Sequence, residues 1–255
     1  MAIIVQDRVR PLGTGPRRDA LPVARTVFYT LDISARFLAA AAIGRGSIPV
    51  ADRLIDGYWR RIFQSGNCRL IVSGREKFDG RASVVMSNHT SLLDIPALMG
   101  AVPGSLRMVM KQELSRVPIW GPALVQSGFV PVERGAKERA IAQLSAAEKM
   151  LSRGVHIWIA PEGTRSRTGE LKPFKKGGFH LARSLGAPII PAWIEGAARV
   201  VPPDRFDASY DGTVVVRFGE PIEPGGATVE GLSAAVREAM IALGQMPLED
   251  EARTG

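Results

Sequence analysis

The sequence predicts an α/β fold with a largely parallel central sheet flanked by helices, preceded by an N-terminal helical hairpin. From residue 67 onward, short β-rich runs alternate with helical patterns, which is typical of a parallel sheet covered by helices. The runs VVMS, HIWIA and IIPAWI are apolar throughout, as expected for strands buried on both faces. Before residue 67, two amphipathic patterns flank a break at Gly44, Gly46 and Pro49.

These patterns divide the chain into four parts. We expect a loose, flexible arm at residues 1–22, because this stretch is rich in Pro, Gly and Arg. An amphipathic helical hairpin follows at residues 23–66, then the α/β domain at 67–245 and an acidic tail at 246–255. The hairpin should contain helices at about residues 25–43 and 50–63.

The hairpin has two interpretations. Its second helix mixes aromatic and cationic side chains, as interfacial membrane helices do: Trp59, Arg60, Arg61 and Phe63. The apolar stripes could equally cover the core of the domain. We expect no membrane-spanning helix, because the most apolar window contains Asp32 and Arg36, each costing about 2.5–3.5 kcal/mol at a bilayer centre.

Within the α/β domain, each expected element rests on its hydrophobic period. The expected strands are residues 69–72, 83–87, 107–110, 129–132, 155–160, 189–194 and 213–218. The expected helices are residues 91–102, 119–126, 137–152, 177–185 and 229–243.

The charge distribution suggests an anionic partner. The first 186 residues carry 28 Lys and Arg against 14 Asp and Glu, whereas the last 69 carry 5 against 11. A basic front and middle fit an anionic membrane surface, a phosphorylated substrate or nucleic acid. They also fit a basic protein without such a partner.

The stretch SNHTSLLD follows the predicted strand 83–87 and opens a helical pattern. Ser91 is a plausible N-cap with Asp94 three positions later, as in a capping box. His89 then lies just beyond the carboxyl end of a strand, where ligands bind in open α/β sheets. Asp94 can turn back to accept a hydrogen bond from one ring nitrogen of His89, leaving the other as a base. The alternative is a helix cap with an incidental histidine.

Two further stretches place cations at strand ends. PEGTRS follows the predicted strand 155–160, and Arg165 in it can hold a phosphate through a two-pronged hydrogen bond. Gly163 permits a tight turn or a close approach to a ligand. Arg134 similarly follows the predicted strand 129–132. Taken alone, each stretch could be a solvated basic loop.

Together the motifs resemble those of the glycerolipid acyltransferase family, typified by 1-acylglycerol-3-phosphate acyltransferase. That family carries the blocks N-H-x-S-x-x-D, K-x-E-L-x-x-x-P-x-x-G, G-x-x-x-x-x-R, E-G-T-R and a later V/I-P. All five occur here in order, at residues 88–94, 111–121, 128–134, 162–165 and 187–191. Ala160 departs from the pattern, since the family usually has an aromatic residue before P-E-G-T-R.

The resemblance implies transfer of an acyl chain from a thioester, acyl-CoA or acyl carrier protein, to a hydroxyl of a lysophospholipid. His89 would be the general base and Asp94 would orient its imidazole. Glu162, Gly163, Thr164 and Arg165 would bind the phosphate or glycerol end of the acceptor. Lys111 and Arg134 would add positive potential. No metal or further cofactor is implied, and the expected location is the cytoplasmic face of a membrane.

Alternatives remain at this point. The acceptor could be lysophosphatidic acid or another lysolipid, such as lyso-ornithine lipid. A covalent mechanism through Ser91 is conceivable, although no G-x-S-x-G elbow is present. A non-catalytic basic module that binds membranes or nucleic acid would explain the charge. It would not explain why SNHTSLLD and PEGTRS both follow apolar strands, so we expect no nucleic-acid partner.

Overall fold

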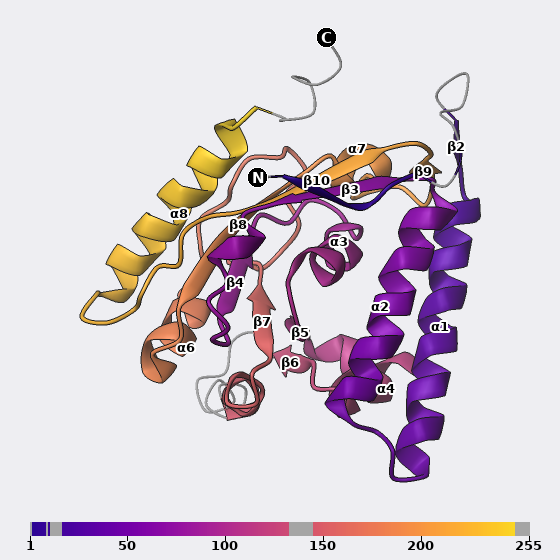
Figure 1. The fold of residues 1–255 in the computed structure, drawn as a ribbon, viewed down its shortest axis with the longest axis horizontal. Helices are drawn as coiled ribbons and strands as arrows, with labels where there is room; N and C mark the ends of the chain where they lie inside the picture. Colours follow the sequence, from indigo (N-terminus) through magenta and orange to yellow (C-terminus); the bar gives the residue numbers. More distant parts are fainter. Residues whose placement is uncertain (1, 9, 11–16, 133–144, 248–255) are drawn as a thin grey trace.

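The computed structural model describes residues 2–8, 10, 17–132 and 145–247, and a large twisted sheet forms its centre (Figure 1). The described strands of this sheet lie in the order β1-β3-β10-β8-β4-β7-β5-β6. Their bounds are β1 Ile3–Gln6, β3 Arg69–Ser73, β4 Val84–Ser87, β5 Leu106–Lys111, β6 Val130–Val132, β7 His156–Ile159, β8 Ile189–Glu195 and β10 Thr213–Phe218. A separate ribbon pairs β2 (Arg18–Asp19) with β9 (Ala208–Ser209).

Most of the sheet is parallel, as the sequence predicts. The strands β8, β4, β7, β5 and β6 all run in one direction, and β3 pairs in parallel with β10. The antiparallel pairs are β10 with β8 and β1 with β3. As a result, the chain leaves β4, β7 and β8 at the same edge of the sheet, where the loops of a parallel sheet form binding sites.

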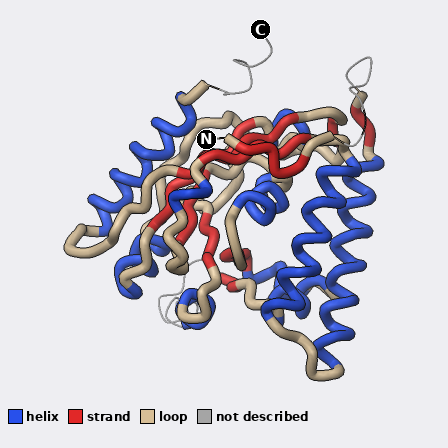
Figure 2. Tube along the Cα trace, viewed as in Figure 1, coloured by secondary structure: helices blue, strands red, loops and turns tan. Residues whose placement is uncertain are grey.

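Helices cover both faces of the sheet (Figures 1 and 2). The described helices are α1 Leu21–Ala42, α2 Ile48–Ser65, α3 Asp94–Ala101, α4 Trp120–Gln126, α6 Gly177–Leu185, α7 Ala197–Val200 and α8 Val229–Gln245, with a further helical stretch at residues 145–151. Two short 3-10 turns are η1 Arg75–Lys77 and η2 Gln112–Arg116. The helices α2 and α3 pack on one face, and α6 and α8 pack on the other.

Strand alternation explains the two cores. In β4, Val85 points to the core beneath α2 and α3, whereas Val84 and Met86 point to the core beneath α6 and α8. All three side chains are fully buried. The uninterrupted apolar pattern of this strand is therefore the consequence of having helices on both faces.

The N-terminal segment differs from the loose arm expected from composition. Ile3–Gln6 forms β1, which adds an antiparallel edge strand beside β3, and β2 is paired with β9. The strand β1 forms in a stretch without Pro or Gly, where three β-branched residues are followed by a glutamine and the backbone pairs with β3. The acidic tail expected at 246–255 lies almost entirely outside the described residues.

The two helices of the hairpin differ in how much apolar surface they expose. Trp59 and Phe63 in α2 are only 2% and 0% exposed, so these aromatic residues cover the core and are not available to a membrane. An ion pair with a buried arginine also fixes α2, because Arg107 of β5 donates from Nη1 to Asp52 Oδ1 at 2.8 Å. In contrast, α1 packs on α2 and α4 and leaves an apolar stripe exposed. No described helix has the length and apolarity needed to cross a bilayer.

Candidate active site

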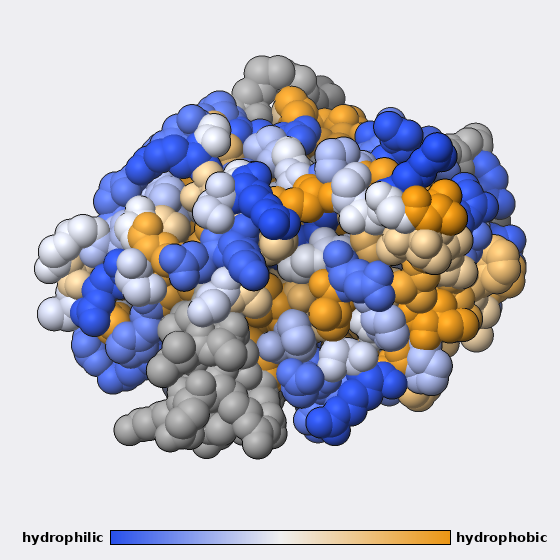
Figure 3. Space-filling view, turned by 90° about the horizontal axis from the view of Figure 1, so that it is seen from below, coloured by the Kyte–Doolittle hydropathy of each residue, from blue (hydrophilic) through white to orange (hydrophobic). Residues whose placement is uncertain are grey.

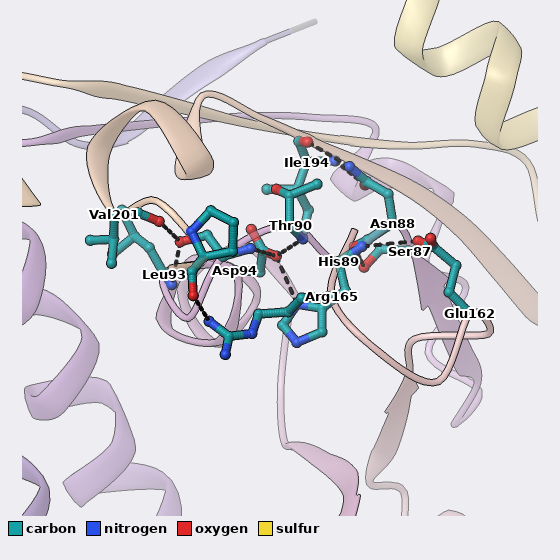
Figure 4. A network of polar contacts seen from close by, with 12 residues as sticks. Ser87, Asn88, His89, Thr90, Leu93, Asp94, Glu162, Arg165, Ile194 and Val201 are labelled. Atoms are coloured by element: carbon teal, nitrogen blue, oxygen red, sulfur yellow. Dashed lines mark hydrogen bonds and ion pairs between the residues drawn. The ribbon is translucent and has the colours of Figure 1, made fainter. Parts of the chain in front are cut away.

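The site begins where the central strand β4 ends (Figure 4). The side chain of Asn88 forms two hydrogen bonds with the backbone of Ile194 in the neighbouring strand β8. Asn88 Nδ2 donates to the carbonyl oxygen at 2.9 Å, and the Ile194 N–H donates to Asn88 Oδ1 at 2.7 Å. This two-point contact fixes the backbone from which His89 leaves the sheet.

His89 and Asp94 form the pair that the spacing predicts. His89 Nδ1 lies 2.8 Å from Asp94 Oδ2, and Asp94 is fully buried at the first residue of α3. The same Oδ2 accepts the backbone N–H groups of Thr90 at 2.7 Å and Ser91 at 2.8 Å. Because Oδ2 is an acceptor, Nδ1 donates the proton of this hydrogen bond, and in the neutral imidazole Nε2 then carries the free lone pair. The side chain of His89 is 16% exposed.

Ser91 differs from the N-cap expected from sequence. The helix α3 begins at Asp94, and Ser91 closes the turn before it by accepting the Leu93 N–H at 3.0 Å. Its hydroxyl donates to the carbonyl oxygen of Val201 at 2.7 Å, and the residue is fully buried. A hydroxyl held in this way has no free approach to a substrate, so the geometry disfavours a covalent serine mechanism.

The second predicted loop follows β7 and lies beside His89. Glu162 Oε1 accepts the His89 N–H at 3.4 Å, and Oε2 accepts the Lys172 N–H at 3.0 Å. The Ser166 N–H donates to the His89 carbonyl oxygen at 2.7 Å. Burial raises the pKa of the Glu162 carboxyl group, and the two donated N–H groups oppose that rise. Glu162 therefore joins the two loops through their backbones.

Arg165 is half-buried in the same loop. Its Nη1 donates to the carbonyl oxygen of Pro203 at 3.1 Å, and Figure 4 shows the guanidinium group and the imidazole of His89 pointing to the same side of the network. Gly163 has φ of 72°, a left-handed conformation that favours glycine. Thr164 is exposed. The two loops thus meet at one edge of the sheet.

Of the other two predicted cations, Lys111 lies farther along this edge. Lys111 ends β5, which is separated from β4 by β7, and its side chain is exposed. Arg134 lies outside the described residues. In the block that begins at Lys111, a Cβ on Gly121 would lie 2.3 Å from the carbonyl oxygen of Ser115. Only glycine therefore allows α4 to start so close to η2.

Sequence reasoning did not identify the β8–β9 loop as part of the site. Val201 and Pro203 contact Ser91 and Arg165 through backbone carbonyl oxygens alone. Any residue type supplies such an oxygen, so the sequence holds no signal for either contact.

Other reactive groups lie away from this arrangement. Cys68 is 2% exposed, and burial raises the pKa of its thiol to about 11, which keeps it protonated at neutral pH. Within the described ranges, no cluster of three or more His, Cys, Asp or Glu side chains could hold a metal ion.

Comparison with known proteins agrees with this geometry. Residues 69–195 match the family model described as Acyltransferase. This stretch contains all five motif blocks. The chain belongs to the acyltransferase family. It is 34% identical over 165 residues to a putative 1-acyl-sn-glycerol-3-phosphate acyltransferase of Caenorhabditis elegans, covering 63% of this chain and 58% of that protein. It is 31% identical over 186 residues to a human 1-acyl-sn-glycerol-3-phosphate acyltransferase beta, covering 69% and 66%.

A solved structure extends the acyltransferase comparison beyond the motifs. The 1-acyl-sn-glycerophosphate acyltransferase of Thermotoga maritima aligns with a TM-score of 0.73 and 25% identity, over 92% of this chain and 96% of that one. The curated sequence relatives are longer than their matched regions. This chain spans only 40% of a Brassica napus relative and 58% of that from Caenorhabditis elegans.

The remaining buried histidine generates a prediction about stability. His156 of β7 is 6% exposed, its Nδ1 accepts the Ser83 N–H at 3.1 Å, and burial lowers its pKa from 6.5 to about 4. The unfolded chain therefore binds a proton between these pH values that the native protein does not. This contribution to stability is complete above pH 6.5 and is lost as the pH falls toward 4.

We expect the substitution His156→Asn to flatten this dependence. Between pH 7 and pH 4.5 the wild-type protein should lose on the order of 2 kcal/mol more unfolding free energy than the variant. Urea denaturation at both pH values measures the difference. His180→Asn, at an exposed position, is the control and should follow the wild type. Equal pH dependence in wild type and His156→Asn would contradict the prediction.

Proposed function

We propose that the protein transfers a fatty acyl chain from a thioester to the free hydroxyl of a lysophospholipid, with lysophosphatidic acid as the first choice of acceptor. The observation that carries the proposal is the His89–Asp94 pair beside Arg165, in a chain of the acyltransferase family. The names of the relatives, which refer to 1-acyl-sn-glycerol-3-phosphate, support the choice of acceptor.

His89 is the proposed general base. Its Nε2 takes the proton of the acceptor hydroxyl as the oxygen attacks the thioester carbonyl, and Asp94 stabilises the imidazolium ion that forms. The tetrahedral intermediate then expels the thiolate, which receives the proton from Nε2. The thioester is already activated, so no acyl-enzyme is required. A general base typically contributes about 10²–10⁴-fold to such a rate.

Arg165 is the proposed ligand of the acceptor phosphate. One of its nitrogen atoms is engaged by Pro203, which orients the guanidinium group while leaving further N–H donors for an anion. Gly163 and Thr164 would contact the same end of the acceptor, and Lys111 would add positive potential at the edge. Glu162 would act in this region by holding its loop against His89.

A membrane surface is the proposed location of the reaction. On α1 and at its C-terminal cap, the exposed apolar side chains are between 43% and 69% accessible: Leu21, Val27, Phe28, Leu31 and the cap residue Ile43. Ile119 and Val125 continue this surface on the neighbouring α4 region, and Figure 3 shows apolar atoms gathered on the side where these helices lie. Exposed Arg25 and Arg45 fit the anionic lipids of a cytoplasmic leaflet.

The donor and the exact acceptor define the alternatives. Acyl-CoA and acyl carrier protein both supply a thioester, and another lysolipid such as lyso-ornithine lipid could replace lysophosphatidic acid. Incubation of the purified protein with both donors and a panel of lysolipids separates them. Lipid binding without release of free thiol from any donor would instead favour a non-catalytic membrane module.

The base assignment predicts that His89→Ala abolishes transfer without disturbing the fold. Release of free thiol from the acyl donor measures turnover, and circular dichroism checks the fold. Because a positioned base is worth at least about 100-fold, activity above about 10% of wild type would contradict the role. The control is His180→Ala in α6, which should retain wild-type turnover.

The phosphate assignment predicts that Arg165→Ala weakens acceptor binding. Losing a charge-assisted hydrogen bond should raise the acceptor KM about tenfold or more while the donor KM stays unchanged. The acceptor KM of Arg165→Lys should lie between those of the wild type and Arg165→Ala, because lysine keeps the positive charge but cannot form the two-pronged hydrogen bond. The matched control is Arg167→Ala, whose side chain pairs with Asp204 on the surface. An unchanged acceptor KM in Arg165→Ala would remove the assignment.

The membrane proposal predicts that the double substitution Phe28→Asp and Leu31→Asp lowers binding to vesicles of phosphatidylcholine and phosphatidylglycerol. Both side chains are exposed in the protein, so folding should be intact. Losing two apolar groups that would insert into the membrane should weaken binding at least about tenfold. Co-sedimentation measures it. Ile241→Asp, an exposed apolar position on α8, should bind as the wild type does. Equal binding by both variants would rule out α1 as the contact.

A further inference from the structure

The imidazole of His89 has a second neighbour besides Asp94. Trp158 of β7 contacts it edge to face, with ring centroids 5.3 Å apart and ring planes at 90°. The tryptophan is 4% exposed, and its strand lies directly beside β4. The contact therefore comes from a rigid strand in the core and not from a loop.

Trp158 is also joined to the backbone that carries His89. Its indole N–H donates to Ser87 Oγ at 2.9 Å, and that hydroxyl donates to the carbonyl oxygen of Asn88 at 2.8 Å. Ser87 is fully buried and Asn88 is 3% exposed. On the other side, Asn88 is bonded to Ile194 of β8. The two residues before His89 are thus held by both neighbouring strands.

These contacts restrict different motions of the imidazole. The bond to Asp94 fixes the position of Nδ1, but a ring held at one atom can still swing about that point. The edge-to-face contact with a buried, hydrogen-bonded indole opposes such a swing and so helps to determine where Nε2 points. Edge-to-face packing is a preferred geometry of aromatic pairs, and misplacing a reacting group by about 1 Å can cost about 100-fold in rate.

We infer that Trp158 is a positioning residue for the catalytic base. It acts through the imidazole and through Ser87, and it touches neither substrate. This inference rests on the proposed role of His89. It assigns a function to a residue that lies outside the five motif blocks, two positions before the unusual Ala160.

The test compares four variants by steady-state kinetics. Trp158→Leu and Trp158→Met remove the ring, whereas Trp158→Phe keeps an aromatic ring but not the indole N–H. In the first two variants we expect kcat to fall about tenfold or more, with both KM values within about twofold of wild type. Trp158→Phe should keep a kcat close to that of the wild type, because it keeps an aromatic ring. The control is Trp193→Leu, which removes a tryptophan from β8 on the other face of the sheet and should keep kcat.

A structural role alone would give a different pattern. If Trp158→Leu keeps wild-type kcat, or if Trp158→Leu and Trp193→Leu lose activity equally and in proportion to stability, the inference is wrong. A rise in KM with unchanged kcat would also overturn it. Loss of kcat in Trp158→Phe as large as in Trp158→Leu would show that the ring contact is not what matters.

A spectroscopic measurement tests the contact without relying on activity. The ring protons of His89, assigned with a His89→Asn variant, should show a ring-current shift in the wild type that disappears in Trp158→Leu and persists in Trp193→Leu. Absence of the shift in the wild type would overturn the inference even if no ring-deleted variant folds. If His89→Ala stays active while the shift is present, the proposed function fails and the contact stands.

Discussion

The site depends on one oxygen atom. Asp94 Oδ2 receives the imidazole Nδ1–H and two consecutive backbone N–H groups, and it lies in a fully buried side chain at the start of a helix. A buried carboxylate is stable only when such donors satisfy it, and the positive end of the helix dipole adds to the effect. Because the backbone donors fix the carboxylate, the carboxylate can in turn fix the ring. The second oxygen, Oδ1, is buried and has no partner among the described residues, so the three hydrogen bonds act through a single atom.

The parallel sheet gives this pair its surroundings. The strand β4 lies between β7 and β8, and all three release the chain at the same edge. Residues 89, 162 and 203 are far apart in sequence. Residue 89 follows β4, residue 162 follows β7, and residue 203 follows β8 and the short helix α7. The loops then bind one another chiefly through backbone groups, with Glu162, Ser91 and Arg165 as the side-chain partners. With this arrangement, the imidazole and the guanidinium group point to the same side of the network (Figure 4).

The two helices of the hairpin divide their tasks. The inner helix α2 buries Trp59 and Phe63 in the core and pairs Asp52 with a buried arginine. Its contacts therefore help to stabilise the α/β domain. The outer helix α1 packs on it through a small core that includes Phe37 and Ala51, and its other face stays apolar and exposed. An amphipathic pattern shows that a helix has an apolar face but not what covers it. The sequence could therefore not distinguish the two helices.

The sequence by itself determined the largely parallel sheet, the positions along the chain of its seven strands after residue 67 and the pairing of His89 with Asp94. These features follow from local rules: apolar runs for buried strands, and a five-residue spacing that a helix start can close. Only the tertiary structure decided that residues 3–6 join the sheet, that Glu162 binds backbone groups of the neighbouring loop, and that Trp158 lies against the imidazole. Each of these depends on contacts between distant segments or on backbone atoms common to every residue, and neither leaves a periodic signal in the sequence.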